Sequence, residues 1–275
     1  MIDLWPPLAG NDWIPTRDAL HDYLQIIGEI RTQLAPRQKH WWHVGLLPSL
    51  NGVSTGRLRQ NEKSFAIEAD LQNSRVILSF QDEDPLHISL NGQSSRALWS
   101  QMHDVVSGRG IQLEIGDLGT NTVELTGYSP EQARALGNGL NSITWIFETF
   151  KGEQRKETGP ITLWPHHFDL ALLWFSGRLV EGADPDDEEK ADEQMNFGFA
   201  TGDRAISEPY VYITAYPLPE RLSDTPLPEG AYWHTEGWQG AVMPYASLIQ
   251  TADPGEHLLG FMRRLIEAGQ ELMGL

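Results

Sequence analysis

The sequence predicts an α+β protein made of two similar α-β(n)-α units with antiparallel sheets, related by a pseudo-twofold axis. Three observations support this fold class. Long segments with apolar residues three and four positions apart flank blocks of short strands with alternating residues. The strands do not alternate one by one with helices, as they would in a parallel βαβ fold. The same order of elements also occurs twice along the chain.

The first half opens with a helix whose apolar residues keep helical spacing until Pro36 stops it. An apolar aromatic run follows that is too short for a helix and predicts a strand. Two alternating runs joined by a polar turn predict a hairpin. The expected elements are a helix over 16–35, a strand over 40–48, a hairpin over 65–80, a strand over 86–90, and a helix capped by Ser94 or Ser95.

The second half repeats this order. It opens with a capping box that has proline at the first helical position, Ser129-Pro130-Glu131-Gln132, which predicts a helix start. A histidine-containing aromatic run and further alternating runs predict strands. The expected elements are a helix from 130 to about 150, strands over 164–175, 195–199 and 209–216, a hairpin over 231–243, and a helix over 254–273.

Two short matches support an internal repeat. Trp42-His43 aligns with His166-His167, and Gly56-Arg57-Leu58 with Gly177-Arg178-Leu179. Chance recurrence of a common α+β pattern is the alternative. A repeat divides the chain into a first unit over 1–120 and a second over 121–275, within one compact molecule. The second unit carries an acidic loop at 181–194.

Composition excludes several classes of function. The 275 residues include no cysteine, which rules out disulfide scaffolds, thiol nucleophiles and thiolate metal sites. The formal charge is −18 and the 20 basic residues form no patch, so no nucleic-acid partner is expected. Without a signal peptide or an apolar run long enough to span a bilayer, the expectation is a cytoplasmic protein with no membrane contact. The oligomeric state is not set by the sequence.

The main candidate site combines His167 and Asp169 with His43. On one strand, His167 and Asp169 would share a face, and the carboxylate would orient the imidazole. If the repeat holds, His43 approaches the same axis from the other half. Two histidines and one carboxylate suit a divalent transition metal with open positions. The alternatives are a metal-free His/Asp site and histidines that only fill the core.

Three further residues are candidate ligand contacts. His21 borders the apolar face of the first helix, and the alternative is a boundary histidine without a binding role. Arg178 follows a glycine and could clamp an anion, or form a surface ion pair. Tyr216 alternates with Tyr210 and Tyr212 on one strand, where the aromatics line a pocket or pack across strands. Trp233-His234 and Trp238 flank a glycine-containing hairpin, as a lid or as ordinary hairpin aromatics.

These aromatic–histidine segments resemble a bacterial family known as domain-of-unknown-function family 5996. The resemblance covers almost the whole chain and implies a shared fold without an established activity. It is carried by Trp5-Pro6-Pro7-Leu8, Leu20-His21 through Ile30-Arg31, His40-Trp41-Trp42-His43-Val44, His167-Phe168-Asp169-Leu170-Ala171, Phe175-Ser176-Gly177-Arg178, Tyr216-Pro217 and Met243-Pro244-Tyr245.

Three functions remain open at this point. The first is binding of a small polar molecule in a cleft lined by His and Asp from both halves. The second is a metal-assisted hydrolase on the same residues. The third is a non-catalytic interaction protein that uses the acidic loop.

Overall fold

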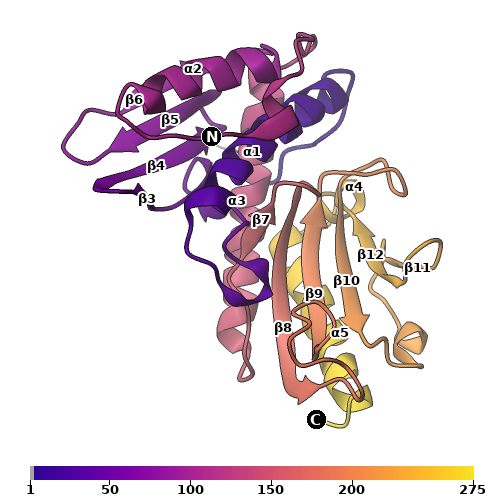
Figure 1. Cartoon of the computed structure of the whole chain (residues 1–275). Helices are drawn as coiled ribbons and strands as arrows, with labels where there is room; N and C mark the ends of the chain where they lie inside the picture. Colours follow the sequence, from indigo (N-terminus) through magenta and orange to yellow (C-terminus); the bar gives the residue numbers. More distant parts are fainter. Residues whose placement is uncertain (1–2) are drawn as a thin grey trace. The chain divides into compact units, whose positions relative to one another are not determined.

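The computed structural model describes residues 3–275. In this part of the chain, five α-helices accompany two antiparallel sheets of six strands each (Figure 1). The predicted α+β class is therefore confirmed. None of the helices in residues 3–275 is both long and apolar enough to cross a membrane.

The chain forms two compact units. Unit 1 comprises Met1–Asn141 and Leu163–Phe168, and unit 2 comprises Ser142–Thr162 and Asp169–Leu275. Residues 121–141, which the sequence analysis assigned to the second half, lie in unit 1. The boundary between the units falls inside helix α3 (Pro130–Glu153). This helix is continuous across the boundary, because its buried apolar residues keep helical spacing throughout. The pseudo-twofold relation stays a prediction.

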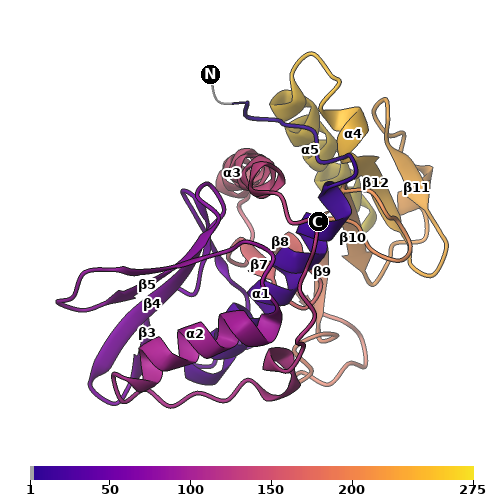
Figure 2. The same ribbon diagram turned by 90° about the horizontal axis from the view of Figure 1, so that it is seen from above.

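Unit 1 packs helices against a sheet with strand order β1-β2-β4-β5-β6, with β3 paired to β4. The first helix buries Leu20, Leu24 and Ile27, and β4 and β5 bury alternate residues. Figure 2 shows α2 running along the strands. The elements are α1 (Trp13–Leu34), η1 (Lys39–Trp41), β1 (Leu47–Ser49), β2 (Gly52–Ser54), β3 (Leu58–Gln60), β4 (Lys63–Asp70), β5 (Arg75–Phe80), β6 (Leu86–Ser89), α2 (Ser95–Ser107) and η2 (Gly116–Gly119).

Unit 2 contains most of the second sheet, whose order is β11-β12-β10-β9-β8-β7. Helix α5 packs on one face of β9 and β10 (Figures 1 and 2). On that face alternate residues such as Phe197, Phe199 and Ile213 are fully buried. The elements are β7 (Thr162–Trp164), β8 (Asp169–Leu179), β9 (Asp192–Ala200), β10 (Tyr210–Tyr216), η3 (Leu222–Asp224), β11 (Tyr232–His234), β12 (Gly240–Pro244), α4 (Tyr245–Leu248) and α5 (Pro254–Leu272).

Two predicted strands are wrong in their histidine-containing parts, while residues 47–48, 164 and 169–175 do lie in strands. Residues 40–46 form a short 3-10 helix and turns, because His40 and Trp41 both adopt positive φ angles, of 52° and 57°. The predicted strand over 164–175 is interrupted after Trp164 by a turn that ends at Phe168, whose φ is 54°. His167 therefore lies in a turn, and the prediction that it shares a strand face with Asp169 is wrong.

Candidate functional site

In unit 1, the turn over 165–168 lies directly against helix α1. A Cβ atom on Gly28 would stand 2.4 Å from Pro165 Cγ, so only glycine admits the proline ring at this distance. The turn also places the Phe168 ring on His21, with ring centroids 5.4 Å apart and 23° between the planes. The predicted candidate His21 is thus held at a helix–turn contact.

Two histidines of the turn complete this group. The rings of His166 and His167 are 4.3 Å apart. Burial lowers the pKa of His166, and the charges of His167 and His21 act in the same direction. Burial also lowers the pKa of His21 below its ordinary 6.5, although the carbonyl groups of His166 and Pro165 oppose the shift. Both imidazoles are therefore favoured in the neutral form.

These shifts predict an acid-sensitive unit 1. Because the unfolded chain binds more protons than the folded one below pH 6.5, the free energy of unfolding falls as pH decreases through that value. His21→Gln should flatten this decrease by on the order of 1 kcal/mol between pH 7.5 and 5. Urea titrations at several pH values measure it, with the exposed His87→Gln as control. An unchanged pH slope in His21→Gln contradicts the assignment.

The cavity beside these histidines is small. Its volume is about 150 Å³, and Gln25, Glu29, Pro165 and His166 are among its walls. This is below the range of about 300–1,000 Å³ of ordinary small-molecule pockets. The cluster is therefore better suited to holding the turn on α1 than to enclosing a ligand.

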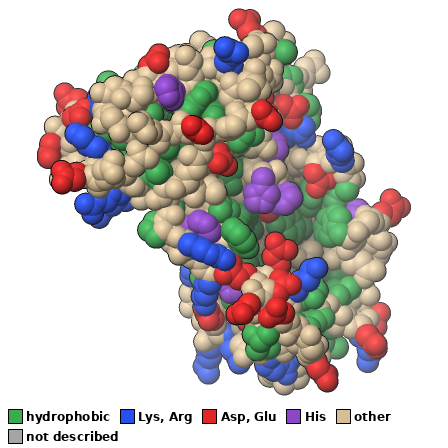
Figure 3. All heavy atoms as spheres, in the orientation of Figure 1, with side chains coloured by type: hydrophobic (Ala, Val, Ile, Leu, Met, Phe, Trp, Pro, Cys, Tyr) green, Lys and Arg blue, Asp and Glu red, His purple; other side chains and the backbone are tan. Residues whose placement is uncertain are grey.

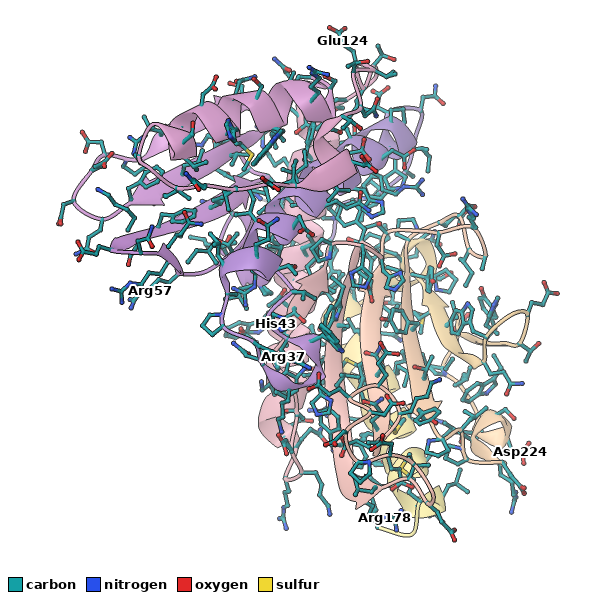
Figure 4. All side chains as sticks on the ribbon, viewed as in Figure 1. Arg37, His43, Arg57, Glu124, Arg178 and Asp224 are labelled. Carbon is teal, nitrogen blue, oxygen red and sulfur yellow. The ribbon has the colours of Figure 1, made fainter. Side chains whose placement is uncertain are left out.

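The contacts of His43 come from residues close to it in the chain. It is 6% exposed, and its Nδ1 accepts a hydrogen bond of 3.4 Å from the backbone N–H of Gln38. Its ring stacks on Trp41 at 5.8 Å, and the Arg37 guanidinium lies 4.8 Å from the centre of the Trp41 ring. Figure 4 shows Arg37 and His43 together at this segment.

In unit 2, the buried carboxylate of Asp169 meets a tyrosine from a strand two positions away. Asp169 begins β8 and is 8% exposed, and the Tyr212 hydroxyl donates a hydrogen bond to its Oδ2. Asn196 donates to the same hydroxyl at 3.4 Å. Burial, followed by the Asp169 charge, raises the pKa of Tyr212 well above its ordinary value. The phenol therefore keeps its proton at neutral pH and donates it in the hydrogen bond to the Asp169 carboxyl group.

A glycine makes this contact possible. Tyr212 on β10 pairs with Gly198 on β9, which pairs in turn with Ala171 on β8. The tyrosine ring lies across Gly198, because a Cβ there would stand 2.2 Å from Tyr212 Cζ. The absence of a side chain at Gly198 lets the phenol cross β9 and reach β8.

A second carboxylate–phenol pair lies on the same sheet face. The Tyr210 hydroxyl donates to Asp203 Oδ2 at 2.6 Å, and the backbone N–H groups of Ala205 and Ile206 donate to Oδ1 at 2.7 and 2.8 Å. Burial raises the pKa of Asp203, but these hydrogen bonds outweigh it and leave the pKa below the ordinary 3.8. Asp203 thereby ties the loop over 203–209 to strand β10.

Removing this anchor should loosen the loop. Asp203→Ala is expected to lower the free energy of unfolding by about 1–3 kcal/mol at neutral pH, because Tyr210 loses its acceptor. Since the folded-state pKa is depressed, the difference from the wild type should shrink as pH falls below 3.8. Urea titrations at pH 3 and 7 test this, with the exposed Asp224→Ala as control. Equal stability of both variants at pH 7 would rule out the anchor.

Aromatic side chains cover the two pairs. The Trp238 ring lies 6.3 Å from those of Tyr210 and Tyr212 and 4.5 Å from that of His234. Gly240 gives the indole room, since a Cβ there would stand 2.8 Å from Trp238 Cζ3. Figure 3 views the face of the sheet opposite α5, where hydrophobic side chains gather next to acidic ones.

A pocket of about 490 Å³ adjoins this network. One wall is the loop over 205–209 that Asp203 anchors, and the other is the segment over 232–236 of the β11–β12 hairpin. The residues that line it include Glu208, Tyr232, His234 and Glu236. Its volume suits a metabolite-sized molecule.

The remaining predicted residues of unit 2 lie outside this pocket. Arg178 pairs with Glu193 at 2.8 Å and also donates to the backbone oxygen of Met273, so it ties the end of β8 to the C-terminal segment (Figure 4). This is the ion-pair alternative of the sequence analysis. Tyr216 is exposed at the end of β10 and precedes a cis peptide bond to Pro217.

The structure thus distributes the predicted site over both units. His21, His43 and His167 belong to unit 1, and Asp169, Arg178 and Tyr216 to unit 2. Within residues 3–275, no three or more His, Asp or Glu side chains are grouped so that they could hold a metal ion. The sequence analysis did not single out Asp203, Glu208, Tyr232 or Glu236, although the neighbouring tyrosine alternation and the Trp233-His234 pair pointed to this region.

Fold and site together define an α+β protein with two six-stranded sheets and an aromatic, acid-lined pocket in unit 2. The chain belongs to the family of unknown function DUF5996, which matches residues 5–275. Comparison with curated proteins and with solved structures gave no significant match.

Proposed function

We propose that this protein binds a small polar molecule in the pocket of unit 2. The observation that carries the proposal is the pocket of about 490 Å³ whose loop wall is fixed by the Asp203–Tyr210 pair. Fixing a wall before binding reduces the entropy that the ligand must offset. Polar groups held inside an aromatic sheet face are costly for folding alone, which favours a role in binding.

The larger pocket of unit 1, of about 580 Å³, supports binding less well. Its amide side chains are already used, because Gln60 Nε2 donates to the backbone oxygen of Gln112 at 2.8 Å and Gln60 Oε1 accepts from its N–H at 2.7 Å. Gln33 likewise donates to the backbone oxygen of Glu114. These amides hold an extended segment in place and leave fewer groups for a ligand.

This proposal keeps the small polar ligand expected from the sequence and moves it to a pocket within one unit. Asp169 does not line this pocket, but it accepts the hydrogen bond of Tyr212 on the sheet face beside it. The grouping of His43, His167 and Asp169 around a metal is not carried forward, since no metal-holding group occurs in the described chain. A role for the acidic loop in partner binding stays a prediction.

Three probes of one shape and different charge test the proposal: choline, 3,3-dimethylbutan-1-ol and 3,3-dimethylbutanoate. At least one should bind the wild type in ligand-observed NMR and lose tenfold or more in affinity with Ser207→Trp, which fills the pocket from the loop wall. Ser223→Trp, exposed outside the pocket, is the matched control. The proposal fails if none of these probes binds and neither n-butylammonium nor n-butanol does, or if both tryptophan variants bind equally well.

A further inference from the structure

We infer that the pocket of unit 2 selects a small organic cation, a molecule that carries an ammonium group. This inference rests on the proposed function and specifies the chemistry of its ligand. Three observations support it: the cavity itself, aromatic residues in its wall, and acidic residues among those that line it.

The charge that faces the pocket is negative. Glu208 is among the residues that line the loop wall and Glu236 among those that line the hairpin wall, so two acidic residues border the cavity on its two walls. Asp203 lies behind the loop, close enough to His234 for the two charges to interact. Among the lining residues in the described chain there is no lysine or arginine. A cleft lined by charges of one sign concentrates ligands of the other sign.

The aromatic wall suits a weakly hydrated cation. Tyr232 and His234 line the pocket, and the Trp238 ring lies 4.5 Å from that of His234, tilted by 37°. The π faces of such rings attract ammonium groups, including those that carry methyl substituents. A site for an anion would instead need N–H donors. An anionic ligand would find two glutamates and no positively charged partner among the lining residues.

His234 is the one group that could reverse this sign. Its Nε2 lies 2.9 Å from the backbone oxygen of Glu236, which binds the ring to the hairpin itself. The two lining glutamates are therefore the charged groups that the test below addresses.

The test compares choline with its neutral isostere 3,3-dimethylbutan-1-ol and its anionic counterpart 3,3-dimethylbutanoate, at pH 8 and low salt. Choline should bind the wild-type protein at least tenfold more tightly than either, and its advantage should shrink as salt is added. The pair n-butylammonium and n-butanol extends the comparison to primary amines, and tenfold preference for either cation supports the inference.

Two double variants of equal net charge locate the effect. Glu208→Gln with Glu236→Gln should remove the preference for the cation, whereas Glu220→Gln with Glu229→Gln, both exposed outside the pocket, should keep it. The inference is overturned if neither choline nor n-butylammonium is preferred over its neutral counterpart, or if the first variant keeps the preference; either result leaves the pocket itself intact. Absence of binding by all five probes overturns the proposed function as well.

Discussion

Gly198→Ala is expected to lower the free energy of unfolding by about 3 kcal/mol. The added methyl group would stand 2.2 Å from Tyr212 Cζ and 2.4 Å from its hydroxyl oxygen, so the ring must leave its place. When it does, the buried carboxylate of Asp169 loses a hydrogen bond from a phenol. Elsewhere in a strand, the same substitution would stabilise the chain by roughly 0.5–1 kcal/mol.

A double-mutant cycle measures this contact. In a Tyr212→Ala background, Gly198→Ala should cost little, because the ring that it displaces is already absent. Gly260→Ala, on helix α5 with open space around the position, is the matched control and should leave stability unchanged or raise it. A cost at Gly198 that is the same in both backgrounds would contradict the assigned packing of Tyr212.

Gly28→Ala is expected to have a similarly large effect in unit 1, about 2–3 kcal/mol of lost stability. Helix propensity alone favours alanine at this position by about 1 kcal/mol. The substitution would, however, place a Cβ 2.4 Å from Pro165 Cγ and 2.8 Å from its Cβ, and the proline ring cannot rotate away. The turn that carries His166 must then lift from helix α1.

Two measurements separate this clash from a general loss of stability. Pro165→Gly removes the colliding ring and should recover part of the loss in the double variant. The imidazole resonances of His21 and His166 should shift in Gly28→Ala, because the burial that lowers their pKa depends on the turn. Undisturbed resonances together with full stability would show that the turn does not lie on α1.

Much of the fold follows from local sequence patterns. The Ser94 side chain accepts from the backbone N–H of Ala97, as its position before an apolar helix predicts, and α5 starts at Pro254 after a capping aspartate. Alternation predicts the β4–β5 hairpin, because one face of each strand is buried. These patterns are local, and the forces that produce them act over a few residues.

The candidate site depends on features that local patterns do not contain. The alternation of Tyr210 and Tyr212 predicts a shared face, but the carboxylate that each phenol meets depends on register. Tyr212 reaches Asp169, 43 positions away, because the strand between them has Gly198 at the crossing point. The role of Asp203 becomes visible only in the folded loop, where the backbone N–H groups of Ala205 and Ile206 donate to its carboxylate.

In the two histidine-containing segments, the sequence predicts strands where the structure has turns. Apolar, aromatic composition around His43 and His167 predicts strands, since such residues favour a pleated surface. Positive φ angles at His40, Trp41 and Phe168 break both segments into turns. Nothing in the composition of these segments marks those angles, because they are imposed by packing around the chain rather than by glycine.

The central claim, that the ligand site lies in the pocket of unit 2, is tested most directly by the indole N–H resonances of the ten tryptophans during a choline titration at pH 8. Trp233 lines the pocket and the Trp238 ring contacts that of His234, so these two resonances should shift together and saturate. The other eight should stay in place. Shifts confined to other tryptophans, such as the exposed Trp145, would place binding elsewhere and contradict the claim.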